Sequence, residues 1–210
     1  MKSQTLQETS ATVYLGLTLT SNLTWSNHIS GMTTKANRVL NFLKRNLKKC
    51  PPSLKEKAYT TYVRPIMEYG STVWDNNVHK NVNEIEKVQR RAARFVSNNY
   101  QNRASVSDMI QTLGWNTLQE RRTYTNLVMF YKISYHLVAI PQSFLPPLLC
   151  TGHFSRYNHT LAYLIPYSRI EAYKQSFVPR TVTLWNTLPS EIVYADTLDV
   201  YKNRLSSFMF

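Results

Sequence analysis

A chain of 210 residues with 43% hydrophobic and 12% aromatic side chains has enough apolar surface for a folded core, which excludes an intrinsically disordered protein. No apolar run approaches the roughly 18 residues that a membrane span needs, so we expect no membrane partner. The excess of 25 basic over 12 acidic side chains gives a formal charge of +13 and favours a polyanionic partner instead.

The cysteines and the N-terminus indicate the compartment. Cys50 and Cys150 lie far apart in the chain and are typical of reduced thiols rather than of a disulfide framework. The first ten residues are polar and lack the apolar centre of a signal peptide. We therefore expect an intracellular protein, in the nucleus or the cytoplasm, and not a secreted one.

The positive charge is concentrated in two segments. Residues 35–57 contain eight basic residues and one acidic residue, and residues 80–103 contain six basic residues and two acidic ones. Together they supply 11 of the 13 excess charges. On charge alone, nucleic acid is the leading partner and an anionic membrane surface the second, and nucleic acid is the partner that we expect. Basic residues that merely solvate exposed helix faces are the remaining alternative.

The N-terminal part predicts a β element. In residues 11–20, ATVYLGLTLT, the apolar residues Val13, Leu15, Leu17 and Leu19 alternate with other residues, which predicts one strand with one face on a core. The following Ser21-Asn22 is typical of a turn.

From Ser26, a possible N-cap, the apolar period lengthens and predicts a helix that Pro51-Pro52 ends. The pattern of Ser53 and Glu56 is that of a capping box, which predicts that the next helix starts there. Pro65 should kink or end that second helix.

Further helices are expected downstream. They cover residues 81–96, residues 108–113, and a stretch from a second capping box at Thr117–Glu120 to about residue 137. Prolines then predict a linker or surface loop after residue 138, and an aromatic, irregular part ends in a helix over residues 196–208. The predicted fold is mainly α: a helical bundle with a short N-terminal β element and an irregular aromatic C-terminal part.

The segment EIVYADTLDVY raises the question of polymerase chemistry. Tyr194 to Thr197 stops one residue short of Tyr-Ala-Asp-Asp, the catalytic turn of many reverse transcriptases. However, Asp196 and Asp199 begin a pattern of helical spacing, where a carboxylate stabilises a helix N-terminus. We expect Asp196 to cap the last helix and expect no metal there.

Other catalytic or metal motifs are weak. Cys150, His153 and His159 offer three possible zinc ligands without a second nearby cysteine, whereas structural zinc takes four. Phosphate-binding glycine loops and nucleophile motifs are not found. We expect no independent enzyme, no catalytic residues, no metal and no cofactor.

Basic side chains on the predicted helices are the best candidates for a binding site, because guanidinium and ammonium groups on one face can hold successive phosphates. The candidates are Arg38, Arg45, Lys48, Lys49, Lys87, Arg90, Arg91 and Arg94. Nearby aromatic residues can stack on bases, but helical spacing more often indicates core. These are Tyr59, Tyr62, Tyr69, Trp74, Phe95 and Tyr100.

Several segments, in a fixed order, resemble the carboxy-terminal part of the open reading frame of non-LTR retrotransposons, the jockey and chicken-repeat-like elements of animals. The similarity runs from about Val13 to near the end. The segments are YLGL, LTWSNHI, YVRPIMEYGSTVWD, IEKVQRRAARFV, LGWNTLQERR and SFVPRTVTLWNTLP.

The resemblance implies three regions. Residues 1–25 would hold the last palm-like strand, with Tyr14 to Leu17 near the primer grip. Residues 26–138 would be a basic, thumb-like helical region that contacts the backbone of an RNA/DNA duplex. Residues 139–210 would be an aromatic and helical region after the proline-rich linker. Within it, residues 176–189 have no assigned role and are expected as core, with Trp185 and Leu188 buried.

In the resembled family the catalytic aspartates and their magnesium belong to the palm, which precedes Tyr14. With only thirteen residues before Tyr14, we expect this chain to be a non-catalytic fragment of an RNA-directed DNA polymerase, with the palm absent. The alternative is a protein-interaction or scaffold domain that docks on a separate palm domain and has no nucleic-acid role of its own.

Overall fold

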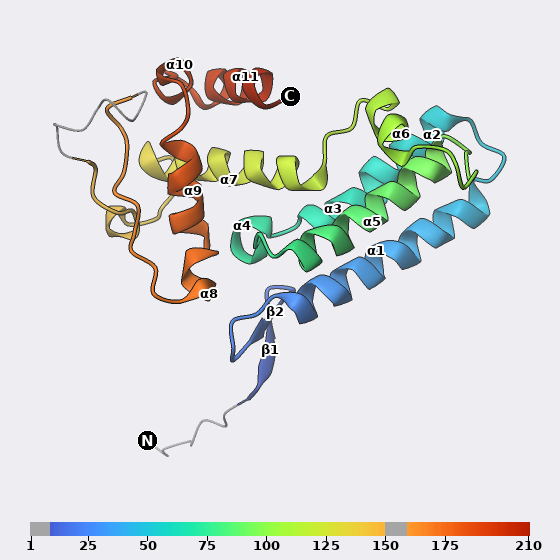
Figure 1. The fold of residues 1–210 in the computed structure, drawn as a ribbon, viewed down its shortest axis with the longest axis horizontal. Coiled ribbons are helices and arrows are strands. Elements are labelled where there is room, and N and C mark those ends of the chain that lie inside the picture. Colours follow the sequence, from blue (N-terminus) through green and yellow to red (C-terminus); the bar gives the residue numbers. More distant parts are fainter. Residues whose placement is uncertain (1–8, 150–158) are drawn as a thin grey trace.

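The computed structural model describes residues 9–149 and 159–210. Within these ranges the fold is mainly α, as predicted, and the two strands near the N-terminus form one antiparallel sheet. Figure 1 shows long helices side by side in one part of the molecule and a second group of helices around the C-terminus, joined by helix α7.

The β element is a hairpin, so the prediction of one continuous strand was wrong. Strand β1 (Ala11–Tyr14) pairs with β2 (Leu17–Thr20), and Tyr14 faces Leu17 across a two-residue turn. Leu15 and Gly16 in this turn have positive φ angles of 47° and 79°, the geometry of a tight hairpin turn that glycine favours. The chain reverses at Gly16, and the alternating leucines therefore do not share one buried face. Ser21-Asn22 forms the predicted turn.

The hairpin is attached to the helices through Tyr69 and Gly70. The Tyr69 hydroxyl donates a 3.1 Å hydrogen bond to the Leu15 carbonyl, and a Cβ on Gly70 would lie 3.1 Å from a Leu17 methyl. Gly70 has a φ of 63°, so both its conformation and the close approach of Leu17 disfavour a larger residue. Leu17 is the hairpin residue that enters the core.

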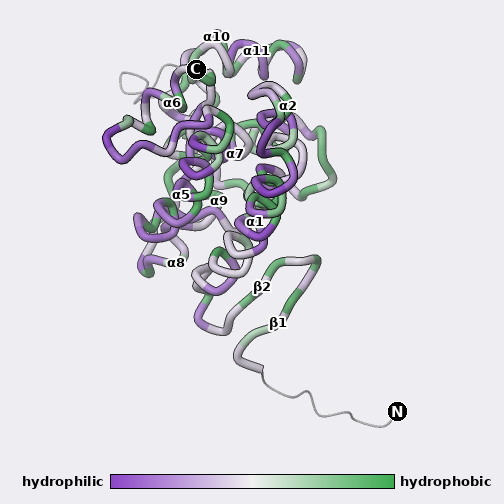
Figure 2. Tube along the Cα trace, turned by 90° about the vertical axis from the view of Figure 1, so that its right-hand side faces the viewer, coloured by the Kyte–Doolittle hydropathy of each residue, from purple (hydrophilic) through white to green (hydrophobic). Residues whose placement is uncertain are grey.

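The first core lies between helices α1 (Ser26–Asn46), α3 (Arg64–Glu68) and α5 (His79–Val96), with α2 (Pro52–Ala58), α4 (Ser71–Trp74) and α6 (Val106–Thr112) around them. Helices α1 and α5 each bury one stripe of residues. Figure 2 shows hydrophobic and hydrophilic residues recurring along both helices. Among the aromatic residues expected in the core, Tyr59, Trp74 and Phe95 are buried, whereas Tyr62, Tyr69 and Tyr100 are exposed.

Two predicted helix starts were wrong. Ser26 is the first residue of α1, and the preceding cap position is Trp25, whose side chain caps nothing. Helix α2 starts at Pro52 after Pro51, and Ser53 forms no capping hydrogen bond. The missing donor of a proline suits the first turn of a helix, and Glu56 instead accepts a 2.8 Å hydrogen bond from the Trp115 indole.

Pro65 does not end its helix. A π-helical segment, η1 (Tyr59–Val63), lies between α2 and α3, and the chain remains helical through Pro65 to Glu68. Because a π turn shifts the backbone pairing by one residue, it accommodates a proline that donates no hydrogen bond.

Helix α7 (Leu118–Ser134) joins the two parts of the protein. The predicted capping box at its start is confirmed, because the Thr117 side chain and the Glu120 side chain each bond the other's backbone N–H. Leu118 packs in the first core, whereas Leu127 and Phe130 pack in a second one. One helix therefore belongs to both cores. The division into regions at residue 138 stays a prediction.

The second core is aromatic. It lies among α7, α9 (Phe177–Trp185), α10 (Ser190–Val193) and α11 (Leu198–Met209), whereas the short helices η2 (Gln142–Phe144) and α8 (Glu171–Lys174) contribute no residue to it. Tyr131 stacks on Tyr201 with ring centroids 4.1 Å apart, and Phe130 lies 5.0 Å from Trp185. The expectation that Trp185 and Leu188 are buried is confirmed.

The cap of α11 differs from the prediction. Thr197, not Asp196, occupies the N-cap, and its hydroxyl accepts the Val200 N–H at 3.3 Å. Asp196 precedes the cap and is exposed. Asp199 lies in the first turn, where its negative charge interacts favourably with the positive end of the helix dipole.

Candidate nucleic-acid interface

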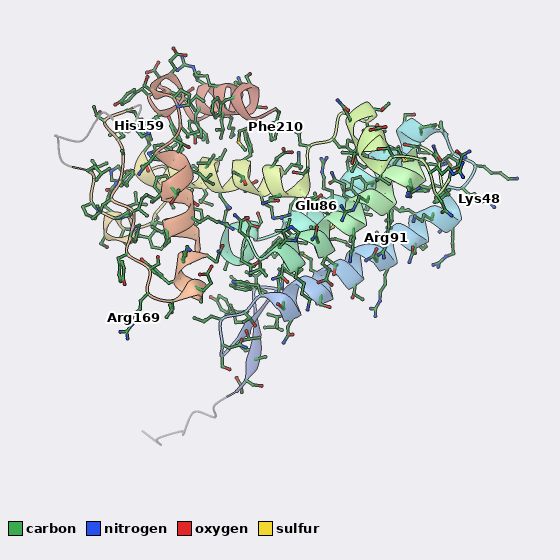
Figure 3. All side chains as sticks on the ribbon, in the orientation of Figure 1. Lys48, Glu86, Arg91, His159, Arg169 and Phe210 are labelled. Carbon is green, nitrogen blue, oxygen red and sulfur yellow. The ribbon has the colours of Figure 1, made fainter. Side chains whose placement is uncertain are left out.

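A groove with basic walls lies between α1 and α5. Arg38 and Lys44 line it from α1, and Arg91 and Arg94 line it from α5. Figure 3 shows Arg91 on α5 beside α1, and Lys48 past the end of α1 at the edge of the molecule. Uncharged residues complete the lining, namely Thr34, Asn37, Asn41 and Tyr100.

The helical repeat explains why these residues meet. Ala36, Leu40 and Leu43 of α1 pack inward, so positions 34, 38 and 41, offset from this stripe, line one side of the groove. On α5, Ala92, Phe95 and Val96 pack inward, which turns Arg91 and Arg94 toward α1. Arg91 donates a 2.9 Å hydrogen bond to the Asn37 side chain across the groove.

The groove concentrates positive charge. Partial burial, and secondly the nearby Arg91 guanidinium, lower the pKa of Lys44 below its ordinary value. None of the residues that line the groove is acidic. An anion in the groove would relieve the repulsion among its cations, because it would supply the opposite charge that the groove walls lack.

The structure brings three of the eight candidate residues together in the groove: Arg38, Arg91 and Arg94. Arg45 is exposed farther along α1, and Lys48 and Lys49 are exposed in the turn after it. Lys87 is exposed on α5. Among the residues that the structure describes, none of the eight takes part in a salt bridge.

Arg90 lies apart from the other arginines of α5. It lines a different hollow, between α5 and α6, together with Glu86 and Trp115. Burial raises the pKa of Glu86, while its hydrogen bond from the Gln119 N–H and the charges of Arg122 and Arg90 act in the opposite direction. Arg90 therefore has an acidic neighbour that the groove arginines lack.

Sequence reasoning missed Lys44 and underrated Tyr100. Lys44 is only half-exposed, at the border of the apolar stripe of α1, and charge alone did not separate it from its neighbours. Tyr100 follows α5 and is not on its helical pattern, so the spacing that predicts core residues does not apply to it.

A second polar centre, which sequence reasoning also missed, is structural. Asp75, which follows α4, lies 2.8 Å from Arg122 of α7 and 2.8 Å from Arg180 of α9, and it accepts a 3.1 Å hydrogen bond from Asn126. Arg122 is fully buried over the ring of Trp74. Buried charges persist only when they are paired, so this cluster ties the two cores together.

Two further kinds of site, metal centres and membrane spans, can be checked in the described ranges. The residues described there contain no group of three or more side chains that could hold a metal ion. Of the weak zinc candidates, Cys150 and His153 lie outside the described residues, and His159 is buried with its Nε2 3.0 Å from the Trp185 carbonyl. No described helix is both long and apolar enough to cross a bilayer.

Comparison of the chain with protein-family models, with curated proteins and with solved structures found no match. The candidate interface therefore rests on its own geometry.

Proposed function

We propose that this protein is a thumb-like, non-catalytic part of a retrotransposon-type RNA-directed DNA polymerase and that it binds the phosphates of an RNA/DNA duplex along α1 and α5. The observation that carries the proposal is the groove in which Arg38, Lys44, Arg91 and Arg94 converge without an acidic residue. Lys48 and Lys49 extend the same positive surface past the end of α1. The protein acts inside the cell, in the nucleus or the cytoplasm.

The physical basis is charge neutralisation. Each phosphate that a cation contacts releases condensed counterions, so affinity falls steeply with salt and depends little on base sequence. Guanidinium groups also bind phosphate oxygens in a bidentate manner, which favours arginine at such contacts. Polymerase chemistry and its magnesium belong to a separate palm in this proposal, and no residue of this chain is assigned to them.

The test is a titration of a fluorescent RNA/DNA duplex with the whole protein at increasing salt. Six phosphate contacts predict a loss of about a thousandfold in affinity between roughly 50 and 200 mM salt. The double variant Arg38→Gln/Arg91→Gln should lower the slope of log affinity against log salt by about 1.4 to 1.8, because two contacts disappear.

The matched control removes the same charge elsewhere. Arg169 and Lys174 are exposed near α8, away from the groove, so Arg169→Gln/Lys174→Gln should leave the salt slope near that of the unmodified protein. Equal losses in both double variants would mean that net charge alone attracts the duplex. Salt-insensitive binding, or none at low salt, would refute the proposal.

A second candidate function is docking on a separate palm domain, and the exposed hairpin favours it. Val13 and Leu15 are 68% and 71% exposed, and Tyr14 beside them is exposed as well. Apolar residues at the end of a two-stranded sheet are suited to a protein contact. Leu15→Lys should then weaken binding to a reverse-transcriptase palm domain of a jockey-like element without changing the affinity for duplex. Unchanged palm binding would exclude this role for the hairpin.

A further inference from the structure

Tyr100 is the one aromatic side chain among the residues that line the α1–α5 groove in the described chain. Tyr100 is 55% exposed, and it shares the groove with Arg91 and Arg94. Phosphate binding alone makes no use of an aromatic ring. A ring beside two arginines therefore offers a second kind of contact in this groove.

The backbone holds this tyrosine in place. Helix α5 ends in a Schellman motif, in which the Asn99 N–H donates to the Arg94 carbonyl at 3.1 Å and the Asn98 N–H donates to the Phe95 carbonyl at 3.4 Å. Asn98 takes the left-handed conformation, with a φ of 50°, that this motif requires. Tyr100 comes two residues later and is positioned by the end of the helix.

Side chains fix the same turn from both sides. The Asn99 side chain accepts the Gln101 N–H at 3.1 Å, and Arg94 donates to the Gln101 carbonyl at 3.1 Å. A groove arginine thus bonds the residue after Tyr100. Such preorganisation lowers the entropy that a ring loses when it stacks on a ligand.

The other groove residues offer a polar group beside the ring. Asn37 is already engaged, since it accepts from Arg91 and donates to the Thr33 carbonyl at 2.9 Å. Asn41 lines the groove, is exposed and makes no side-chain hydrogen bond within the part of the chain that the structure describes. Its amide can donate to or accept from the edge of a base.

Duplex and single strand make different use of such a site. In a duplex the bases are paired and stacked on each other, so a ring at the level of the phosphates meets no free base face. In a single strand the bases are available, and sites for single strands combine a cationic groove with aromatic rings.

We propose that the α1–α5 groove binds an unpaired stretch of nucleic acid, with Tyr100 stacked on one base while Arg91 and Arg94 hold the adjoining backbone phosphates. This proposal rests on the proposed function and specifies its ligand: the groove cations bind backbone phosphates of either form, and Tyr100 adds a contact that only a strand with an unpaired base can use.

The experiment measures the affinity of the whole protein for a short oligoadenylate RNA and for a blunt RNA/DNA duplex of equal charge. Tyr100→Ala should weaken RNA binding by about 5- to 150-fold, the equivalent of the roughly 1–3 kcal/mol of one base–aromatic stack. It should leave duplex binding unchanged. Tyr100→Phe keeps the ring and should retain the affinity of the unmodified protein for the single strand.

The matched control is Tyr62→Ala, because Tyr62 is 62% exposed and lies outside the groove, in η1. Its affinity for both probes should not change. Tyr100 is exposed and is not a member of the first core, and a circular dichroism spectrum that matches the unmodified protein would confirm that the variant folds.

The outcomes separate the two proposals. If Tyr100→Ala binds the single strand normally while Arg38→Gln/Arg91→Gln loses affinity, the stacking proposal is wrong and the phosphate-binding function stands. Equal losses for single strand and duplex on removal of the ring would also overturn it. If the unmodified protein binds neither probe at low salt, both proposals fail.

Discussion

The two halves of the molecule neutralise their cations differently. Residues 9–118, around the first core, contain 15 basic and 6 acidic side chains, whereas residues 119–210 contain 9 and 5. In the second half Arg180 lies against Asp75, Lys202 pairs with Asp199, and Arg204 bonds the Glu191 carbonyl. The basic residues of the α1–α5 groove have no acidic partner among the described residues, although Arg91 and Arg94 bond the uncharged Asn37 side chain and the Gln101 carbonyl.

The acidic residues of the first half explain this difference, because most of them bond something else. Glu68 pairs with Arg121 and Asp75 with Arg122, both on α7. Glu56 accepts from Trp115 and Glu86 from the Gln119 N–H. Packing of α7 therefore uses acids that would otherwise weaken the positive field of α1 and α5. The local electrostatic field therefore depends on where the opposite charges lie, as well as on how many charges there are.

The largest expected effect comes from cutting the pair that joins the halves. Asp75→Asn leaves Arg122 buried without a counter-charge, which should lower the free energy of unfolding by about 3–5 kcal/mol. Urea unfolding followed by circular dichroism measures it. The control is Asp199→Asn, because that carboxylate is 89% exposed in its pair with Lys202 and should change stability by less than about 0.5 kcal/mol. A loss below about 1 kcal/mol for Asp75→Asn would mean that the two halves do not depend on this cluster.

A smaller effect is expected at the helix that both cores share. Thr117→Ala removes the capping box of α7 and should cost about 1 kcal/mol. Ser53→Ala is the matched change at α2, where the hydroxyl caps nothing, and should be close to neutral. Thermal unfolding of the two variants compares them directly. If the two changes cost the same, the cap of α7 does not contribute to the junction.

Each half also contains a buried histidine that makes stability depend on pH. Burial lowers the pKa of His28 and of His159 below the ordinary value for imidazole, although for His159 the hydrogen bond to the Trp185 carbonyl acts in the opposite direction. The two imidazoles therefore bind protons more readily in the unfolded chain than in the folded protein. We expect the contribution of these histidines to the free energy of unfolding to be largest above about pH 6.5 and to decrease as the pH drops below that value.

Denaturant unfolding at a series of pH values measures this dependence. His28→Gln and His159→Gln should each flatten it, and His79→Gln, at an exposed position, should not. Unfolding free energies that stay constant down to pH 5 would contradict the expected titration of both buried rings.

The smallest effect on stability is expected where the proposed effect on binding is large. Arg38→Gln/Arg91→Gln removes two exposed cations without salt-bridge partners, so the free energy of unfolding should stay within about 0.5 kcal/mol of the unmodified protein. Chemical denaturation measures it alongside the salt titration. A loss of several kcal/mol would show that these cations support the fold, and the contrast between the two halves would disappear.

The sequence alone predicts most of the long helices and much of the core. Periodicity locates α1, α5 and α7, and the Thr117–Glu120 pattern identifies a real cap, because these features depend on residues a few positions apart. The same local rules fail at Ser53 and Asp196. Helix α2 begins at the Pro51-Pro52 pair instead of at Ser53. In α11, Thr197 takes the N-cap position that was predicted for Asp196.

The basic surface was predictable only in outline. Charge counting identified the helices, but it could not separate Arg90 from Arg91, neighbours that face different hollows. Lys44 and Tyr100 enter the groove because of tertiary packing between α1 and α5 and because of the turn after α5. The cluster around Asp75 joins segments about 50 and 105 residues apart in the chain, which local patterns do not connect.

Because α7 packs in both cores, residues cannot be inserted into this helix or deleted from it without disturbing one of the cores. One residue inserted between Arg122 and Leu127 would turn everything beyond it by about 100° and advance it by about 1.5 Å. Leu118 would stay in the first core, while Phe130 and its neighbours would lose their register with Trp185. Insertions should therefore be tolerated in the connection after α7 and not within that helix, so that the length of α7 is as strongly constrained as its composition.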